Sequence, residues 1–322
     1  WLYASVPEVF ALLNLFVVLI LFLLLEFVES RSWRYLWFAC FVFGLALTHH
    51  HFILFLTPIF IYLIYPIVMQ AKTKGRLLIK GFFLFLFGLL PYAYVVWAAQ
   101  STPVINWENP RNLNGIWRLA SRALYGTFRS NTAVGLNPYE RFAALKVYFD
   151  TLTVDFTWII LLIVLLGAYD QFRTKRSLFN IIFFGYILSG PLFTYYASFP
   201  VLTNFTFGTA ERFYLVSYLF LAVWLAYGLR FIAHKIDFYL KRIAPYVKIS
   251  TISIFLLLPL TFFATNFVKI TPLKNDKTAE LFAKDVLNST PDNAILFLFD
   301  DTPLFNTQYV YYTAGGASSW RN

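Results

Sequence analysis

The chain has 322 residues, of which 59% are hydrophobic and 13% are charged, and its formal net charge is +10. A soluble domain usually carries about a quarter charged residues, so the composition excludes an ordinary soluble domain and predicts a polytopic membrane protein. In such a protein, positive charge in short loops is a signal of topology, and we expect bilayer lipid, not nucleic acid, as the partner. The single cysteine, Cys40, excludes an intrachain disulfide.

Eight apolar runs are candidates for membrane spans, since a helix needs about twenty mainly apolar residues to cross the hydrocarbon core. In chain order they cover residues 9–27, 35–47, 52–69, 77–99, 156–169, 178–197, 213–232 and 249–267. Pro91 predicts a kink in the fourth run, because proline lacks the N–H of a regular helix. We therefore predict an all-α membrane domain over residues 1–270, with an outer loop over 100–155.

Residues 271–322 are mixed in character and predict the start of a small α/β domain outside the membrane. Residues 278–287 have helical spacing, residues 289–293 are typical of a turn, and the apolar run 294–299 is typical of a buried strand. Asp300 and Asp301 close that run. Because the chain opens on Trp1 inside an apolar segment and stops after a Gly/Ser stretch, we expect it to be cut at both ends.

Short basic loops predict which side of the membrane each end faces. Counting one crossing per run places three clusters of Lys and Arg, around residues 72–80, 173–176 and 230–248, on one side. The positive-inside rule makes that side cytoplasmic. The other face of this multi-pass plasma (inner) membrane protein then holds Glu8, the histidines 49–51, the loop 100–155, the loop 198–211 and the tail. We therefore expect the functional residues to face away from the cytoplasm.

Three consecutive histidines, His49, His50 and His51, lie at one predicted membrane edge. Successive residues of a helix point about 100° apart, so the three cannot share one face, and we predict no metal site from them. One or two of them could face an inner cavity and bind a phosphate near neutral pH. The plain structural alternative is an interfacial polar stop between two short helices.

Arginines of the outer loop form a second candidate site. Residues 113–124 have an amphipathic helical spacing that is typical of a helix in the membrane interface, with Arg118 and Arg122 four residues apart on one face. Two guanidinium groups there suit a lipid-linked phosphate, which arginine binds through paired hydrogen bonds. The alternative is a basic helix that holds lipid headgroups. The pair Glu211–Arg212 is either a surface ion pair or a second contact to phosphate or acceptor.

Four segments, in order along the chain, resemble motifs of the glycosyltransferase C superfamily. More narrowly, they resemble those of a bacterial membrane family related to the transmembrane protein O-mannosyltransferase of plexin-type receptors. The segments are VPEVFALLN (6–14), GLALTHH (44–50), NWENP (106–110) with RALYG (122–126), and ERFYL (211–215). Glu108 and Asn109 replace the Gly and Asp of the third motif.

The resemblance implies a glycosyltransferase that moves a sugar, with mannose as one candidate, from a polyprenyl-phosphate donor to a protein or envelope acceptor on the outer face. We expect no metal or other cofactor, because the residues form no convincing metal-binding group. The family's usual catalytic acid of the first outer loop is expected upstream of this chain. The implied site comprises Glu8 and His50 as catalytic groups, Arg118, Arg122, Arg212 and His49 around the donor phosphate, and Trp107, Glu108, Tyr125 and Glu211 at an acceptor or structural site.

Two other functions remain open from the sequence. One is a lipid-carrier flippase or transporter, which buried charges and discontinuous helices would support. The other is a non-catalytic membrane subunit of an envelope assembly complex.

Overall fold

The computed structural model describes residues 9–103, 105–123, 126, 137–201, 204–239, 260, 263–264, 267–291, 293–299 and 301–313. The chain divides into two compact units. The larger unit is Tyr3–Val247, and the smaller unit is Lys248–Asn322 together with Trp1–Leu2. No strand occurs among the described residues, so the prediction of an all-α polytopic protein is confirmed.

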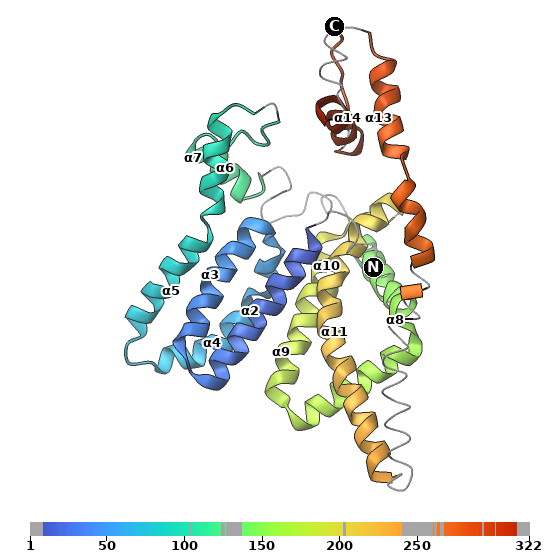
Figure 1. Cartoon of the computed structure of the whole chain (residues 1–322). Coiled ribbons are helices and arrows are strands. Elements are labelled where there is room, and N and C mark those ends of the chain that lie inside the picture. The colour runs from blue at the N-terminus through green and yellow to red at the C-terminus, as the bar shows by residue number, and fades with distance from the viewer. Residues whose placement is uncertain are drawn as a thin grey trace. The chain divides into compact units, whose positions relative to one another are not determined.

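The larger unit consists of helices (Figure 1). In chain order they are α2 (Phe10–Ser30), α3 (Trp33–His49), η1 (His51–Leu56), α4 (Thr57–Gln70), α5 (Lys74–Gly88), α6 (Pro91–Gln100), α7 (Leu113–Ala120), α8 (Pro138–Thr174), α9 (Arg176–Ile187), η4 (Leu188–Leu192), α10 (Phe193–Ala197) and α11 (Asn204–Tyr239). Within the unit, α2 to α5 pack together, and α8 and α9 pack around α11.

Six helical segments among the described residues are long and apolar enough to cross a membrane. They are Phe10–Ser30, His51–Gln70, Lys74–Gln100, Pro138–Thr174, Arg176–Ala197 and Phe207–Ile236. These six correspond to six of the eight predicted runs. The second run forms α3, whose 17 residues extend about 25 Å at the usual rise. The eighth run, 249–267, lies mostly outside the described residues.

Two details of the spans follow from particular residues. The break predicted at Pro91 is confirmed, because α5 ends at Gly88 and Pro91 starts α6. Residues 138–155, which the sequence analysis assigned to the outer loop, form the first half of α8. That half is capped by Asn137, whose side chain accepts the backbone N–H of Glu140 at 2.9 Å. A kink at Thr157 joins it to the half that matches the predicted fifth span.

Glycines allow the closest helix contacts in the larger unit. A Cβ atom on Gly167 of α8 would collide with the carbonyl oxygen of Trp224 in α11, and one on Gly228 would collide with that of Ile163. Gly44 and Gly88 bring α3 and α5 together in the same way. Small residues are common at helix contacts in membranes, where close packing of backbones supplies much of the attraction.

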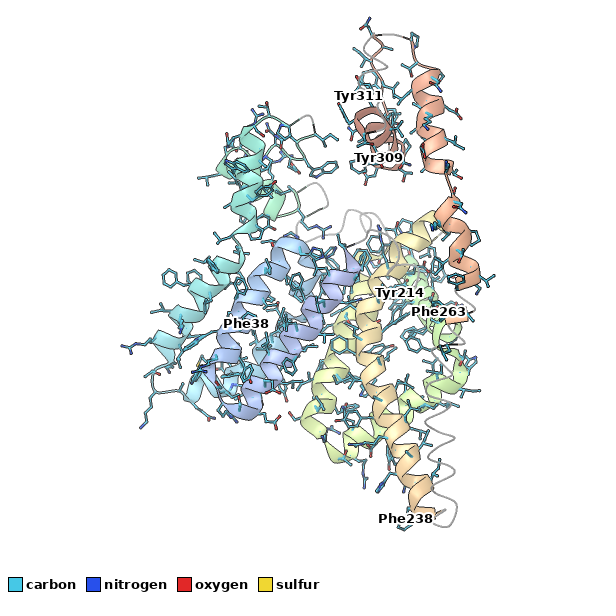
Figure 2. All side chains as sticks on the ribbon, viewed as in Figure 1. Phe38, Tyr214, Phe238, Phe263, Tyr309 and Tyr311 are labelled. Carbon is cyan, nitrogen blue, oxygen red and sulfur yellow. The ribbon has the colours of Figure 1, made fainter. Side chains whose placement is uncertain are left out.

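Aromatic side chains fill the core and also cover the outside of the larger unit (Figure 2). Tyr214 is 2% exposed in the core, whereas Phe38 on α3 is 50% exposed. An apolar outer surface is stable only where lipid or more protein covers it. This surface therefore agrees with the membrane assignment.

The basic turns between helices lie at one end of the larger unit. The rings of Phe10 and Phe213 lie 4.8 Å apart, which brings the starts of α2 and α11 to the same end. At the other end, Arg230 of α11 pairs with Asp170 of α8 at 2.9 Å. The basic turns after α4 and α8 belong to that second end, because both helices run toward it.

The smaller unit contains η5 (Thr271–Asn275), α13 (Thr278–Asn288) and α14 (Asp301–Thr313) among its described residues. The helix predicted over 278–287 is confirmed as α13, which packs against α14. The strand predicted over 294–299 is wrong: Ile295, Phe297 and Phe299 are each more than 80% exposed, and Asp301 starts a helix. A strand needs a neighbouring strand for its backbone hydrogen bonds, and the described part of this unit offers only helices.

Candidate functional site

The start of α2, the junction of α3 with η1 and the start of α11 meet at one end of the larger unit. The His49 Nε2–H donates to the Val9 carbonyl oxygen at 2.8 Å. The His50 ring lies 5.7 Å from the Phe10 ring and 5.9 Å from the Phe213 ring, measured between centroids. Three of the four segments that carry the family resemblance therefore converge here.

The three histidines point to different neighbours. Only His49 reaches Val9, the Nδ1 of His50 accepts the backbone N–H of Phe52 at 3.1 Å, and the Nε2 of His51 lies 3.3 Å from the Tyr92 hydroxyl. The prediction that they share no face is confirmed. Among the described residues, no group of three or more His, Cys, Asp or Glu side chains is placed to hold a metal ion.

His50 is held as a neutral hydrogen-bond donor. It lies between α3 and η1, outside both helices. Burial, assisted by the charges of Arg122, His49, His51 and Arg212, lowers the pKa of His50 from 6.5 to about 3. Because Nδ1 accepts the Phe52 N–H, the single proton of the neutral ring is on Nε2. The ring therefore presents an N–H group, not a lone pair, to whatever its Nε2 meets.

The charges of two arginines from distant segments act on this imidazole. Arg212 lies in the first third of α11, and its guanidinium carbon is 5.8 Å from the centroid of the Phe10 ring. Arg122 follows α7, and its charge acts on both His50 and His51. The sequence separates these arginines by ninety positions. The fold nevertheless brings the two guanidinium charges to the same histidine.

The loop after α6 carries Arg122 to the site. The His51 ring makes a hydrogen bond to the backbone of Ala120, the last residue of α7. At the other side of the loop, the Arg111 Nε–H donates to the Ala99 carbonyl oxygen and the Gln100 side-chain amide donates to the Arg111 carbonyl oxygen, both at 2.9 Å. These bonds fix both ends of the segment 105–123 against the helices.

The amphipathic helix predicted over 113–124 is shorter in the structure. Asn112 caps it by accepting the Gly115 N–H at 2.8 Å, and the helix ends at Ala120. Arg122 then has a φ of 54°, in the left-handed region that ends regular helices. Arg118 and Arg122 consequently do not share a helix face, and this part of the prediction is wrong.

Arg118 and Glu108 form an ion pair, with Arg118 Nε 3.0 Å from Glu108 Oε2. The Glu108 side chain is 6% exposed, whereas that of Arg118 is 50% exposed. Glu108 and Asn109 both have a positive φ, and Gly115 of α7 packs directly on the backbone of Asn109 and Pro110. The pair therefore holds the turn 106–110 against α7, which gives both residues a structural role.

The apolar side of α7 faces outward. Leu113 is 85% exposed and Trp117 is 70% exposed, and Trp107 of the preceding turn is 39% exposed. Large apolar side chains next to basic ones are typical of a helix in the membrane interface. The geometry thus suits a segment that lies on a lipid surface and turns Arg122 toward His50.

Two predicted site residues, Glu8 and Tyr125, lie outside the described residues. Glu211 directly precedes Arg212 in α11 and is half-buried. The sequence analysis missed Tyr92, whose hydroxyl contacts His51, and the rings of Phe10 and Phe213, which enclose His50. The two rings could have been suspected from the sequence, because Phe10 lies near Glu8 and Phe213 follows Arg212 in the motif segments. Tyr92 lies in none of these segments, so no sequence signal indicated it.

Comparisons with known proteins agree with the resemblance seen in the motifs. The family model described as the N-terminal domain of protein O-mannosyl-transferase TMEM260 matches residues 1–73. The chain is 24% identical to the mouse (Mus musculus) protein O-mannosyl-transferase TMEM260 over 326 aligned positions, which cover 98% of this chain and 45% of that relative. The chain therefore spans less than half of the relative's length. No solved structure matches the chain. Together these matches support an O-mannosyltransferase-like family.

Proposed function

We propose that this chain is part of a membrane glycosyltransferase that moves a sugar from a polyprenyl-phosphate donor to an acceptor on the extracytoplasmic face, as a protein O-mannosyltransferase would. The observation that carries the proposal is the meeting of Arg122, Arg212 and the neutral His50 at one end of the helices. The similarity to the mouse O-mannosyl-transferase supports the class of reaction.

The arrangement suits the departure of a phosphate. When the bond between the sugar and the phosphate breaks, the leaving polyprenyl phosphate gains negative charge. Arg122 and Arg212 would stabilise this charge, and the Nε2–H of His50 would donate a hydrogen bond to a phosphate oxygen. Donors that are fixed before the reaction and aimed at developing charge make a large contribution to catalysis. In this proposal His50 binds the donor phosphate, and does not remove a proton, because its Nδ1 lone pair accepts the Phe52 N–H.

The acceptor hydroxyl attacks the anomeric carbon and must lose its proton to a base, for which carboxylates are common. Glu8 remains the candidate from sequence. It directly precedes Val9, whose carbonyl oxygen accepts the His49 N–H. Glu211, next to Arg212, would contact the acceptor. Arg118 is paired with Glu108, so we assign it to support of the loop that carries Arg122.

The test is sugar transfer by the full-length protein in vesicles, from a labelled polyprenyl-phosphate sugar, with Arg122→Ala compared with the wild type. Arg173→Ala is the matched control, because Arg173 lies in the last turn of α8, at the end of the unit away from His50. We expect Arg122→Ala to lower kcat/KM by about a hundredfold or more, and Arg173→Ala to leave it unchanged.

A second measurement separates the donor site from loss of folding. Unglycosylated polyprenyl phosphate should inhibit the wild type and the control variant, and should inhibit Arg122→Ala much more weakly, while the melting temperatures of all three stay close. Equal inhibition of all three proteins would move the phosphate away from Arg122. A protein that transports a lipid-linked sugar across vesicles without transferring it would point to the flippase function instead.

A further inference from the structure

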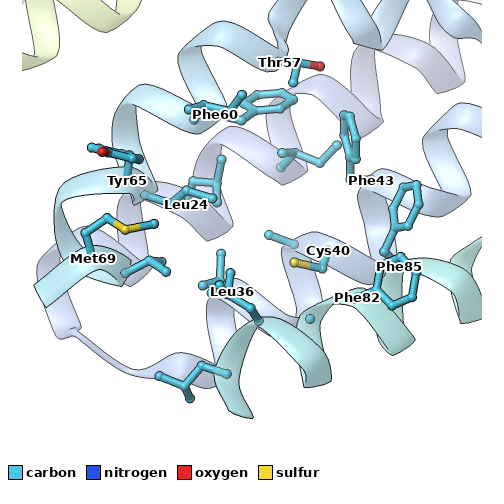
Figure 3. A pocket seen from close by; sticks show the side chains of 18 residues that line it. Leu24, Leu36, Cys40, Phe43, Thr57, Phe60, Tyr65, Met69, Phe82 and Phe85 are labelled. Carbon is cyan, nitrogen blue, oxygen red and sulfur yellow. The ribbon is translucent and has the colours of Figure 1, made fainter. Parts of the chain in front are cut away.

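An apolar groove of about 380 Å³ lies between α2, α3, α4 and α5 (Figure 3). It falls within the usual size of ligand pockets in proteins, about 300–1,000 Å³. Leu24 of α2, Leu36 and Cys40 of α3, Met69 of α4 and Phe82 of α5 are among the side chains that line it. Because nearly every lining group is a hydrocarbon, the groove suits an alkyl chain and offers little to a sugar or a peptide.

The groove extends to the basic end of the helices. Its lining includes Val68 and Met69 at the end of α4 and Leu77 at the start of α5, and the turn between these helices joins them. Toward the other end, the lining reaches Thr57, the first residue of α4, and Phe43 of α3, which precedes His49 by six residues or about 9 Å of helix. A lipid whose headgroup lay at the turn between α4 and α5 would have it at the end of the unit opposite Arg122 and Arg212.

Positive charge is concentrated at this basic end of the groove. The cations at this end of α2 to α5 are Arg31, Arg34, Lys72, Lys74, Arg76 and Lys80, and the acids there are Glu26 and Glu29. Lys80 lies directly beside the groove residue Gly81 in sequence, and its ammonium group sits 3.4 Å from the centroid of the Trp37 ring. An excess of cations at the mouth of a hydrocarbon groove is complementary to a lipid with a negative headgroup.

We propose that this groove binds one acyl chain of an anionic glycerophospholipid, with the phosphate at the basic turn between α4 and α5. The site is independent of the proposed sugar transfer, and its ligand is a membrane lipid and not the polyprenyl donor. Close packing of the acyl chain on the apolar lining and charge pairing at the headgroup both favour this occupant.

The experiment uses the full-length protein in phosphatidylcholine vesicles that contain a trace of phosphatidylglycerol or phosphatidylcholine with a photoreactive diazirine on one acyl chain. After irradiation, the labelled peptides are mapped by mass spectrometry. We expect the phosphatidylglycerol probe to label α3, α4 and α5 residues of the groove about fivefold or more over the phosphatidylcholine probe.

Two variants and two controls test the charge and the cavity separately. The triple variant Lys72→Gln, Lys74→Gln and Arg76→Gln should lose the preference for phosphatidylglycerol, whereas the triple variant of the basic residues between α8 and α9, Arg173→Gln, Lys175→Gln and Arg176→Gln, should keep it. Gly81→Leu should abolish labelling, because a Cβ on Gly81 already lies 3.3 Å from the Cys40 sulfur. Gly75→Leu, on the same helix with no atom within 4 Å of its Cβ position, should not change it.

Equal labelling by the two probes would overturn the proposal, and so would a preference that survives loss of the three cations. Displacement of the phosphatidylglycerol probe by a small molar amount of polyprenyl phosphate would also overturn it, because the groove would then belong to the sugar donor. If Gly81→Leu fails to fold, the triple charge variant still decides the question.

Discussion

The Nδ1 atom of His50 accepts the backbone N–H of Phe52 at 3.1 Å, and this one bond fixes which ring nitrogen carries the proton. The same bond starts η1, since His50 is the cap residue of that helix. A single hydrogen bond of the motif residue His50 therefore both caps η1 and sets the tautomer that the proposed donor site needs. Replacing the imidazole tests whether the remaining N–H is the group that matters.

We expect His50→Gln and His50→Asn to differ in sugar transfer. The glutamine amide can place an N–H donor near the position of Nε2, whereas the shorter asparagine can replace only the Nδ1 acceptor toward Phe52. The glutamine variant should retain kcat/KM within about tenfold of the wild type, and the asparagine variant should lose about a hundredfold. The measurement is steady-state transfer by both variants in vesicles.

Circular dichroism and melting temperature provide the control for folding in this pair. If the two variants have the same activity, the Nε2–H has no special role, and His50 serves only to cap η1. If the asparagine variant is the better enzyme, the assignment of the proton to Nε2 is wrong.

The lowered pKa of His50 predicts how stability changes with pH. The pKa is 6.5 in an ordinary environment and about 3 in the folded protein, so the unfolded state binds more protons between these two values. The contribution of the neutral His50 to the free energy of unfolding is then fully present above pH 6.5 and is lost as the pH falls toward 3. Thermal unfolding in detergent should show a steeper loss over this window for the wild type than for His50→Gln, which has no titrating ring at that position.

Carboxyl groups elsewhere also titrate in this window, so the difference between the two proteins is the quantity to compare. Arg122, Arg212, His49 and His51 act on His50 alike in disfavouring its charged form. Parallel curves for the wild type and His50→Gln would mean that His50 gains a proton without cost, and that the imidazole is not buried as described.

Hydropathy predicted most of the membrane helices because each has a long apolar run, but it missed the helix over 138–155. That segment has one buried side only: Tyr148 is fully buried and bonds to Ser217 at 2.9 Å, whereas Tyr139 is 82% exposed. The mean hydropathy of such a helix is low, because its polar exposed side is averaged with its apolar buried side. The strand predicted over 294–299 failed for the opposite reason, since an apolar run alone does not supply a partner strand.

The sequence named candidate residues for the site, but it could not predict how they are arranged. Spacing along the chain could not predict that Phe10, His50 and Phe213 lie together. Contacts between residues so far apart in sequence arise only from the packing of whole helices. The resemblance of the motifs indicated that these segments belong to one site. It could not indicate that α7 ends before Arg122, a change that depends on the left-handed backbone at that residue.

The ion pair between Arg118 and Glu108 predicts a measurable but small coupling. Because Arg118 is half exposed, solvent screens its charge, and a double-mutant cycle of Arg118→Ala and Glu108→Ala should give a coupling free energy of about 1 kcal/mol or less. The measurement is hydrogen exchange of the α7 amides, which reports local opening of the loop. Sugar transfer by Arg118→Ala should fall much less than that by Arg122→Ala, and an equal fall would return Arg118 to the donor phosphate.

The contact between α8 and α11 predicts a sharp difference between two glycine-to-alanine substitutions. At Gly167 the new Cβ would collide with the Trp224 carbonyl oxygen and crowd the backbone nitrogen of Gly228, so the helices must separate. We expect Gly167→Ala to lower the free energy of unfolding by about 1–3 kcal/mol, the usual range for overpacking. Gly75→Ala meets nothing within 4 Å and should change it by less than about 1 kcal/mol, since alanine only improves helix propensity. Melting temperatures of both variants in the same detergent check this, and equal values would show that α8 and α11 do not approach each other at Gly167.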